Sequence, residues 1–538
     1  MLAATVLLAY FIVNYPIAEP KLGAFVKSGH RPLDFFAYVA LCSLSGVSLA
    51  LALIAFGRVA AVVLGLLALA CLGTNYSVAA ITGVHPLDPS TAQWLFGEIA
   101  HTGDALDEFA RTIARSFAFA VLVALPFTAG VVWTRRQLRP RLSPHSRLPL
   151  GIAGLLGYLA CSYAMGQQFI DDGPVDSNLF AFYVLGLQEH VPETGKVDLP
   201  LQAKTPAVEK VVLVVDESVD HEVYETEILP TWSPLLTADF GEAASTGNCS
   251  APSNALLRWG FRADELLQRQ DPRAWPSIWG YAKGAGYRTI YIDGQHHGAY
   301  QNYMRRSEAA LIDETMPVSA GYDTDRQVAA VIEQLLRKPG RMFIYVNKRG
   351  AHFPYHDHFP RNLIPTSASR EEEYGAAVRY SSRNFLTNML AGVDLASTLV
   401  IYTSDHGQYL AFESSRAESL HCNRNPHWQE LSVPLATVTA VPYLEAELSD
   451  SARRNHNRMR HTQIFPTLLI AMGYEIAAAE GKYGASLIAA QPPEHYYYSE
   501  MKPTPNRSGT PLVREFEAFP FRDVAKPAID EESLVRLK

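Results

Sequence analysis

The chain has 538 residues, a formal net charge of −8, and a composition that is 48% hydrophobic and 19% charged. This length exceeds one ordinary domain, so we expect at least two. The negative charge, and a sequence without a basic stripe interleaved with aromatic residues, argue against nucleic-acid binding. Leu, Ala and Val are concentrated in the first third, whereas the rest has the composition of a soluble globular protein.

Five apolar runs in the first third predict membrane-spanning helices. They lie at residues 2–18, 35–56, 59–82, 116–134 and 148–166. The middle three carry no charge and have about the 20-residue length that crosses the roughly 30 Å hydrocarbon layer of a bilayer. The first run is shorter and could be a signal-peptide core, but it has no preceding basic residue and no small-residue cleavage site. We therefore interpret residues 1–167 as a transmembrane domain, with buried helices of a soluble protein as the less favoured alternative.

Basic residues in the short loops predict how this domain is oriented. Five arginines lie in the segment TRRQLRPRLSPHSR, residues 134–147, and the positive-inside rule places this segment in the cytoplasm. Lys21, Lys27 and Arg31 fall on the outer side in this orientation, but five arginines in one short loop outweigh them. Everything after residue 166 then lies outside the cytoplasm.

Two further segments are more polar, one between the third and fourth apolar runs and one after the fifth run. Residues 85–115 place apolar side chains at helical spacing among acidic ones. This pattern predicts a helix at the membrane surface, or an amphipathic helix packed on the catalytic domain. Residues 168–208 contain Pro, Gly and mixed charge and predict a linker, so that residues 209–538 form the second domain.

Apolar, β-branched runs alternate with helical patterns in this second domain. Strands are predicted at residues 211–215, 289–292, 342–346 and 398–402. Helices are predicted near residues 252–259, 274–285, 323–337, 370–392 and 462–472. Continuous apolar strands between helices indicate an α/β fold with a mainly parallel sheet that is covered on both faces. Ligands bind such sheets at the carboxyl ends of the strands.

Acidic residues and a histidine follow two of these strands. Asp216, Glu217 and Ser218 come after the first strand, and Asp405 and His406 come after the last. Carboxylates and imidazoles that converge from separate strand ends suit a divalent cation. Asp and Ser also cap helices, which is the structural alternative for each pair taken alone. Two such pairs at strand ends in one domain favour a metal site.

Short motifs along the chain resemble the sulfatase-like branch of the alkaline phosphatase superfamily. They include VVLVVDES from residue 211, CSAPSNALLRWG from 249, GAHFPYHDHFP from 350, YTSDHG from 402, SLHCNRNPHWQELSVPL from 419 and HTQIFPTLLIAMG from 461. Within that branch the chain looks most like the inner-membrane phosphoethanolamine transferases, which have five spans, a surface helix and a periplasmic catalytic domain. The resemblance covers nearly the whole chain in architecture, but only these motifs in identity.

The resemblance implies a metal centre and a serine nucleophile. The ion would be held by Glu217, Asp405, His406 and Ser250. Zinc is the ion that the resemblance implies, with manganese as the alternative. Asp216 replaces the usual glycine of the transferases, and would be a further ligand or an acceptor that orients one. Ser250 would attack phosphorus where those enzymes usually have threonine, and Thr246 is the alternative nucleophile.

Other residues are implied around the phosphoryl group. His352 and His421 would bind the phosphoryl oxygens and act as acid or base, since imidazole titrates near neutral pH. His427 is a close alternative to His421. Asn254 occupies the position of the sulfatase arginine and is assigned to substrate binding. Gln295 and His297, in AGYRTIYIDGQHHG, lie near the place where sulfatases bring a lysine and a histidine to the site.

The activity that this resemblance implies is transfer of phosphoethanolamine from phosphatidylethanolamine to a glycolipid or glycan of the bacterial envelope, such as lipid A or a core sugar. The protein would lie in the inner membrane with its catalytic domain in the periplasm. The alternatives are a phosphoglycerol transferase, a sulfatase or phosphodiesterase that hydrolyses its substrate, and a non-catalytic sensor. A formylglycine sulfatase is disfavoured, because Asn254 replaces the arginine and the cysteine lies one place early.

Two of the five cysteines lie in the polar part of the chain. Cys249 adjoins Ser250, and Cys422 adjoins His421. If both neighbours line one site, the two sulfurs come within bridging range, which an oxidising compartment permits.

Overall fold

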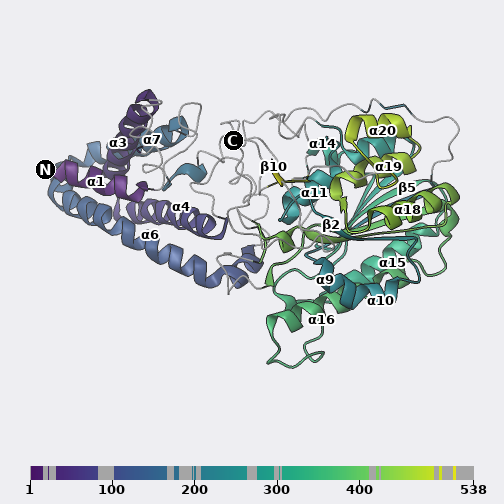
Figure 1. Cartoon of the computed structure of the whole chain (residues 1–538). Coiled ribbons are helices and arrows are strands. Elements are labelled where there is room, and N and C mark those ends of the chain that lie inside the picture. The colour runs from purple at the N-terminus through teal and green to yellow at the C-terminus, as the bar shows by residue number, and fades with distance from the viewer. Residues whose placement is uncertain are drawn as a thin grey trace. The chain divides into compact units, whose positions relative to one another are not determined.

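Figure 1 shows the computed structural model of the chain. It describes residues 2–15, 22, 32–82, 102–165, 175–180, 197, 199–200, 208–262, 275–295, 302, 304, 306–410, 420–422, 426–489, 496–499 and 513–516. The chain divides into two compact units between His190 and Val191.

The first unit is helical and has a helix at each of the five predicted spans. These are α1 (Leu2–Val13), α3 (Pro32–Ala55), α4 (Arg58–Thr82), α6 (Thr102–Leu138) and α7 (Pro144–Ala164). Among the described residues, three are long and apolar enough to cross a membrane: Phe36–Ala55, Arg58–Val78 and Ala110–Arg141. The helix count therefore differs from the expected five spans. The described part of α1 has 12 residues, which is too short, and α7 carries Arg147 near its start.

The prediction of a surface helix at residues 85–115 is wrong for residues 102–115. Residues 102–115 are the first turns of α6 and continue without a break into the fourth apolar run. No glycine or proline lies between residue 104 and Pro126, so nothing in the sequence ends the helix before the apolar run begins. Residues 85–101 lie outside the described part of the chain.

Part of the predicted linker packs into the first unit. In the segment 175–180, Asp176 accepts hydrogen bonds from the hydroxyls of Tyr10 (3.0 Å) and Tyr158 (2.8 Å). The side-chain amides of Asn178 and Asn75 bond to each other at 2.8 Å. These polar groups are buried, and each has a hydrogen-bond partner among the others. The boundary between the units therefore falls inside the predicted linker.

The second unit contains an eight-stranded sheet in the order β4-β3-β5-β1-β6-β7-β2-β8. Its strands are β1 (Lys210–Asp216), β2 (Ala238–Ala244), β3 (Arg288–Asp293), β4 (Glu314–Pro317), β5 (Met342–Asn347), β6 (Thr398–Ser404), β7 (Ser432–Thr439) and β8 (Met459–Arg460). The four predicted strands are β1, β3, β5 and β6, and they lie side by side and parallel. A short pair, β9 (Tyr496–Ser499) and β10 (Val513–Phe516), is antiparallel.

The α/β fold with a mainly parallel sheet is confirmed, although β7 runs antiparallel to both of its neighbours. The predicted helices correspond to α11 (Ser250–Arg258), α13 (Ile278–Gly284), α15 (Thr324–Leu336), α16 (Arg370–Ser382) with α17 (Phe385–Met389), and α19 (Ile464–Ala471). The other described α- and π-helices of this unit are α9 (His221–Val223), the π-helix η4 (Tyr224–Ile228), α10 (Leu229–Trp232), α14 (Arg306–Ala309), α18 (Pro442–Asn455) and α20 (Ile476–Tyr483).

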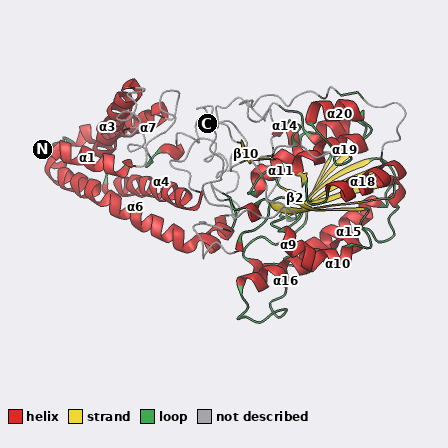
Figure 2. Cartoon of the chain, viewed as in Figure 1, coloured by secondary structure: helices red, strands yellow, loops and turns green. Residues whose placement is uncertain are grey.

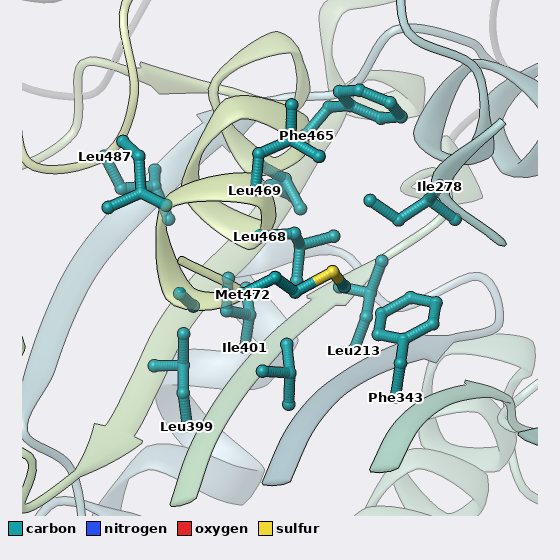
Figure 3. Close-up of a cluster of buried hydrophobic side chains, with 14 of the residues drawn as sticks. Leu213, Ile278, Phe343, Leu399, Ile401, Phe465, Leu468, Leu469, Met472 and Leu487 are labelled. Carbon is teal, nitrogen blue, oxygen red and sulfur yellow. The ribbon is translucent and has the colours of Figure 1, made fainter. Parts of the chain in front are cut away.

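Helices cover both faces of the sheet (Figure 2). Successive residues of β1 point to opposite faces, so Val211, Leu213 and Val215 join one apolar core while Val212 and Val214 join the other. The first core contains α13, α18, α19 and α20, and Figure 3 shows its centre. The second contains α10, α15, α16 and α17. Burial on both faces fixes the sheet and the carboxyl ends of its strands, where the predicted site residues lie.

Candidate active site

Strand pairing brings the two predicted acidic segments together. In the parallel register of β1 and β6, Asp216 lies opposite Ser404. Glu217 and Asp405, the next residues in each segment, therefore leave the same edge of the sheet side by side. Each is buried, with 1% and 0% of its surface exposed.

Glu217, Asp405 and His406 form a compact group whose ligand-type atoms lie within 4.8 Å of one another. The Oε1 atom of Glu217 accepts a hydrogen bond from Ser218 (2.7 Å) and lies 3.5 Å from His406 Nε2. Its Oε2 atom accepts a hydrogen bond from Gln295 Nε2 at 2.6 Å. Gln295 therefore lies at the site, and its amide orients the Glu217 carboxylate. His297, named with it, lies outside the described residues.

Asp405 has one oxygen that hydrogen-bonds the protein and one that does not. Its Oδ1 atom accepts from the backbone N–H of Ser218 (3.0 Å) and of His406 (2.7 Å). Its Oδ2 atom is buried and has no hydrogen-bond partner among the described residues. Burial, and then the charge of Glu217, raise the pKa of Asp405 well above its usual range. A buried carboxylate pair with an unpartnered oxygen is the environment that a bound cation stabilises.

The imidazole of His406 is oriented for metal binding through Nε2. Its Nδ1 atom lies 2.8 Å from the carbonyl oxygen of Gly407, so Nδ1 carries the proton and donates to that oxygen. Burial lowers the pKa of His406, which keeps the ring neutral. The Nε2 lone pair is therefore directed at the group formed with Glu217 and Asp405.

Ser250 is the first residue of α11, and its hydroxyl lies against this group. The Oγ atom is 3.1 Å from Glu217 Oε1 and 3.2 Å from His406 Nε2. The helix is held in this position by Ser253, whose hydroxyl donates to the Asp405 carbonyl oxygen at 2.5 Å. The structure thus brings together four of the five residues predicted as metal ligands.

Asp216, the fifth, has a different environment. Its Oδ1 atom accepts from the Glu217 N–H (3.0 Å), and its Oδ2 atom accepts from Ser382 (2.7 Å), Tyr402 (2.8 Å) and the ammonium group of Lys348. With these four partners the Asp216 carboxylate does not join Glu217, Asp405 and His406, which we call the metal-type group. The expectation that Asp216 is a ligand is therefore not met, and the alternative of an acceptor that orients Glu217 agrees with the structure.

Lys348 is a residue that the sequence did not single out. It follows β5, is fully buried, and also bonds Ser382 at 2.5 Å. Its Nζ atom lies 3.9 Å from Asp325, which accepts the N–H groups of Arg349 and Gly350. The loop after β5 is thereby held against β1. Gly350, at φ +56°, is required there, because a Cβ atom would lie 2.6 Å from the Glu217 backbone.

His421 and His352 lie beside the group. The ring of His421 is 4.5 Å from that of His406 and 6.2 Å from that of His352, between centroids. His421 Nδ1 bonds Gln408 Oε1 at 3.1 Å, and His352 Nδ1 lies 2.6 Å from the Phe353 carbonyl oxygen. Burial lowers the pKa of His421 well below its usual value, so this ring is neutral at neutral pH.

Two predicted substrate contacts lie elsewhere. His427 stacks on Tyr409 with centroids 4.0 Å apart and caps a short 3₁₀-helix at Trp428–Glu430, which makes His421 the better match to the motif. Asn254 is fully buried; its amide donates to the Ser250 carbonyl oxygen (3.0 Å) and accepts from the Tyr345 hydroxyl (2.8 Å). Asn254 therefore stabilises α11, and substrate binding by its side chain is not what this geometry indicates.

Two other expectations can be followed in the structure. The hydroxyl of Thr246, the alternative nucleophile, is buried without a hydrogen-bond partner among the described residues. The predicted bridge between Cys249 and Cys422 is present as a disulfide. Cys42, Cys71 and Cys161 are free.

The donor set fits zinc, because zinc accepts one imidazole together with carboxylates, and it also admits manganese. We expect Asp405→Asn to lower metal affinity by more than the roughly 10–100-fold that loss of an outer partner costs. Metal content of the purified full-length protein, measured by elemental mass spectrometry, checks this. Asp394→Asn is the matched control, since Asp394 is an exposed cap residue. Equal metal content in both variants would refute the assignment.

Residues 234–474 match the sulfatase family model. The full chain has the fold of the integral membrane lipooligosaccharide phosphoethanolamine transferase A from Neisseria meningitidis, with a TM-score of 0.52 at 15% identity over 91% of this chain and 98% of that one. No curated protein sequence matches the chain.

Two other solved structures have TM-scores below 0.5. The zinc complex of the C-terminal periplasmic domain of EptC from Escherichia coli has a TM-score of 0.48 at 16% identity, covering 61% of this chain and 99% of that one. The lipoteichoic acid synthase LtaP from Listeria monocytogenes has a TM-score of 0.39 at 13% identity, covering 56% and 81%.

Proposed function

We propose that this protein transfers phosphoethanolamine from phosphatidylethanolamine to a hydroxyl of an envelope glycolipid or glycan, through a covalent intermediate on Ser250. The observation that carries the proposal is the position of the Ser250 hydroxyl, 3.1 and 3.2 Å from two members of the buried group Glu217, Asp405 and His406. A hydroxyl needs activation to act as a nucleophile at neutral pH. These three side chains suit a divalent cation, which would lower the pKa of the Ser250 hydroxyl.

In the first step, the Ser250 hydroxyl loses its proton and Oγ forms a bond to phosphorus, while the bond from phosphorus to the glycerol oxygen breaks. Diacylglycerol leaves after that oxygen takes up a proton. In the second step, an acceptor hydroxyl loses its proton and attacks phosphorus, and the Ser250 oxygen is released and reprotonated. His421 and His352 lie close enough to His406 to bind phosphoryl oxygens and to move these protons. The N-terminus of α11 adds a favourable field for the anionic phosphoryl group.

The helical first unit supports a lipid donor. In the part of this unit that the structure describes, three helices are long and apolar enough to cross a membrane, and a lipid headgroup is reached at a membrane surface. We propose an inner-membrane location with the second unit in the periplasm, in keeping with the arginine-rich segment 134–147 on the cytoplasmic side.

The donor is tested by diacylglycerol release in detergent. Full-length protein is incubated with phosphatidylethanolamine or with phosphatidylglycerol of the same acyl chains, with and without a lipid A acceptor. We expect release from phosphatidylethanolamine to be at least about 10-fold faster, which corresponds to about 1.4 kcal/mol of discrimination. Faster release from phosphatidylglycerol would reassign the donor. Diacylglycerol release that is equally fast with and without the acceptor would indicate hydrolysis.

A further inference from the structure

The disulfide joins the two segments that carry Ser250 and His421. Cys249 directly precedes Ser250 and caps α11, and Cys422 directly follows His421. The two cysteines are 173 residues apart in sequence, and their Cα atoms lie 5.0 Å apart. One end of this covalent bond is therefore one residue from Ser250, the proposed nucleophile, and the other end is one residue from His421.

A hydrogen bond beside the disulfide makes a second tie between the same segments. The Cys422 N–H donates to the carbonyl oxygen of Asn248 at 2.8 Å. Asn248 is itself anchored, since its side chain donates to Glu430 at 2.9 Å. Cys422 has a positive φ of 65°, a conformation that L-residues adopt only where the surroundings impose it. The backbone at His421 is thus placed by contacts with the segment that leads into α11.

His421 is the residue whose position this arrangement sets. Its ring is buried against His406, and its Nδ1 atom bonds Gln408. The adjacent Leu420 carbonyl oxygen accepts from the Tyr409 N–H at 2.7 Å, which ties the other side of His421 to the loop after β6. His421 is therefore held between the loop that carries His406 and the helix that carries Ser250.

We propose that the Cys249–Cys422 disulfide is a positioning element of the transfer reaction, which fixes His421 relative to Ser250. This inference rests on the proposed function of that site. A displacement of about 1 Å in a catalytic group can cost about 10²-fold in rate. The disulfide forms when the two thiols lose two electrons and two protons to an external disulfide oxidant. Such oxidants act outside the cytoplasm, so the site is completed only after the second unit has been exported.

The first test removes the disulfide from the full-length protein. We expect Cys249→Ser with Cys422→Ser to lower kcat by about 10–100-fold, with metal content and the KM for the lipid donor unchanged. Reduction of the wild type with a dithiol, which supplies two electrons and two protons, should give the same loss, and reoxidation should reverse it. Cys161→Ser, at a free cysteine of the first unit, is the control and keeps full activity.

The deciding test is a double-mutant cycle with His421→Gln. If the disulfide acts by placing His421, this substitution lowers kcat strongly in the wild type and by less than about 2-fold in the double-cysteine variant. An equal fold-loss in both backgrounds would overturn the proposal. Loss of metal or of the folded state in the double-cysteine variant would also overturn it, because the disulfide would then act through stability.

The cycle is separable from the test of the donor. It is read with whichever phosphodiester the wild type cleaves, including phosphatidylglycerol or a chromogenic diester. Failure with phosphatidylethanolamine alone would refute the donor and leave the cycle informative. Turnover of phosphatidylethanolamine with independent effects of His421 and the disulfide would refute the positioning role and leave the proposed function intact.

Discussion

Ser250→Ala is expected to lower the transfer rate by about 10³-fold or more while the protein keeps its metal and its fold. The substitution removes one oxygen atom, which lies against Glu217 and His406, and leaves the three ligand-type side chains in place. Alanine also continues the first turn of α11. Turnover of phosphatidylethanolamine, measured together with metal content, checks both parts of this expectation.

The matched control for this substitution is Thr246→Val, which removes the hydroxyl of the alternative nucleophile and keeps the shape of the side chain. That hydroxyl is buried and has no hydrogen-bond partner among the described residues, so little stability is lost with it. We expect nearly full activity in this variant. A reversed pattern, with Ser250→Ala active and Thr246→Val inactive, would move the nucleophile to Thr246.

Lys348→Met is expected to destabilise the folded chain by about 3–5 kcal/mol, because it leaves buried carboxylates without their cation. Lys348 bonds Asp216 and lies 3.9 Å from Asp325, and all three side chains are almost completely buried. Methionine is similar in length and packs against Phe385, whose ring lies 4.5 Å from Nζ, so the loss of charge is the main effect. Thermal unfolding of the full-length protein in detergent should shift down by about 5–15 °C.

Two further variants isolate the charge effect. Lys283→Met removes the exposed ion pair with Asp313 and should shift the unfolding temperature little, since exposed pairs contribute about 0–1 kcal/mol. Asp216→Asn should recover part of the loss in the Lys348→Met background, because it removes one of the stranded charges. A Lys348→Met protein as stable as the Lys283→Met control would show that the buried network is not required.

The strands and the metal-type group could be predicted because the local pattern carries them. Continuous apolar runs identify β1 and β6, and the polar residues after them must meet at one edge of a parallel sheet. Glu217, Asp405 and His406 were found in this way. Ser250 was found only through the resemblance of its motif, since a serine at the start of a helix is also an ordinary capping residue.

Other parts of the site depend on contacts between segments far apart in sequence. Lys348 appears in the sequence as one basic residue in a loop, and its burial follows only from the packing of Asp216, Ser382 and Asp325 around it. Asp216 was expected among the ligands because a carboxylate next to Glu217 resembles an acid pair. Asp216 is not a ligand in the structure, because its carboxylate forms a salt bridge with Lys348. Alternation of polar and apolar residues, the usual sign of a half-exposed strand, is weak in β2, which is almost wholly buried.

The helical unit shows a similar limit. Apolar length predicted the positions of α3, α4 and the second half of α6, but it did not predict where α6 begins. The first turns of α6 are amphipathic and the rest is apolar, and no helix-breaking residue lies between the two parts. The change of composition therefore suggested two separate segments where the backbone forms one continuous helix. The packing of Asp176 against Tyr10 and Tyr158 likewise comes from tertiary contacts.

The most direct test of the account is the mass of the intact full-length protein after incubation with phosphatidylethanolamine in detergent, without an acceptor. The account predicts an added mass equal to one phosphoethanolamine group, mapped by peptide sequencing to Ser250 and absent from Ser250→Ala. An adduct on another residue, or steady turnover by metal-loaded protein with no adduct on Ser250, would contradict it.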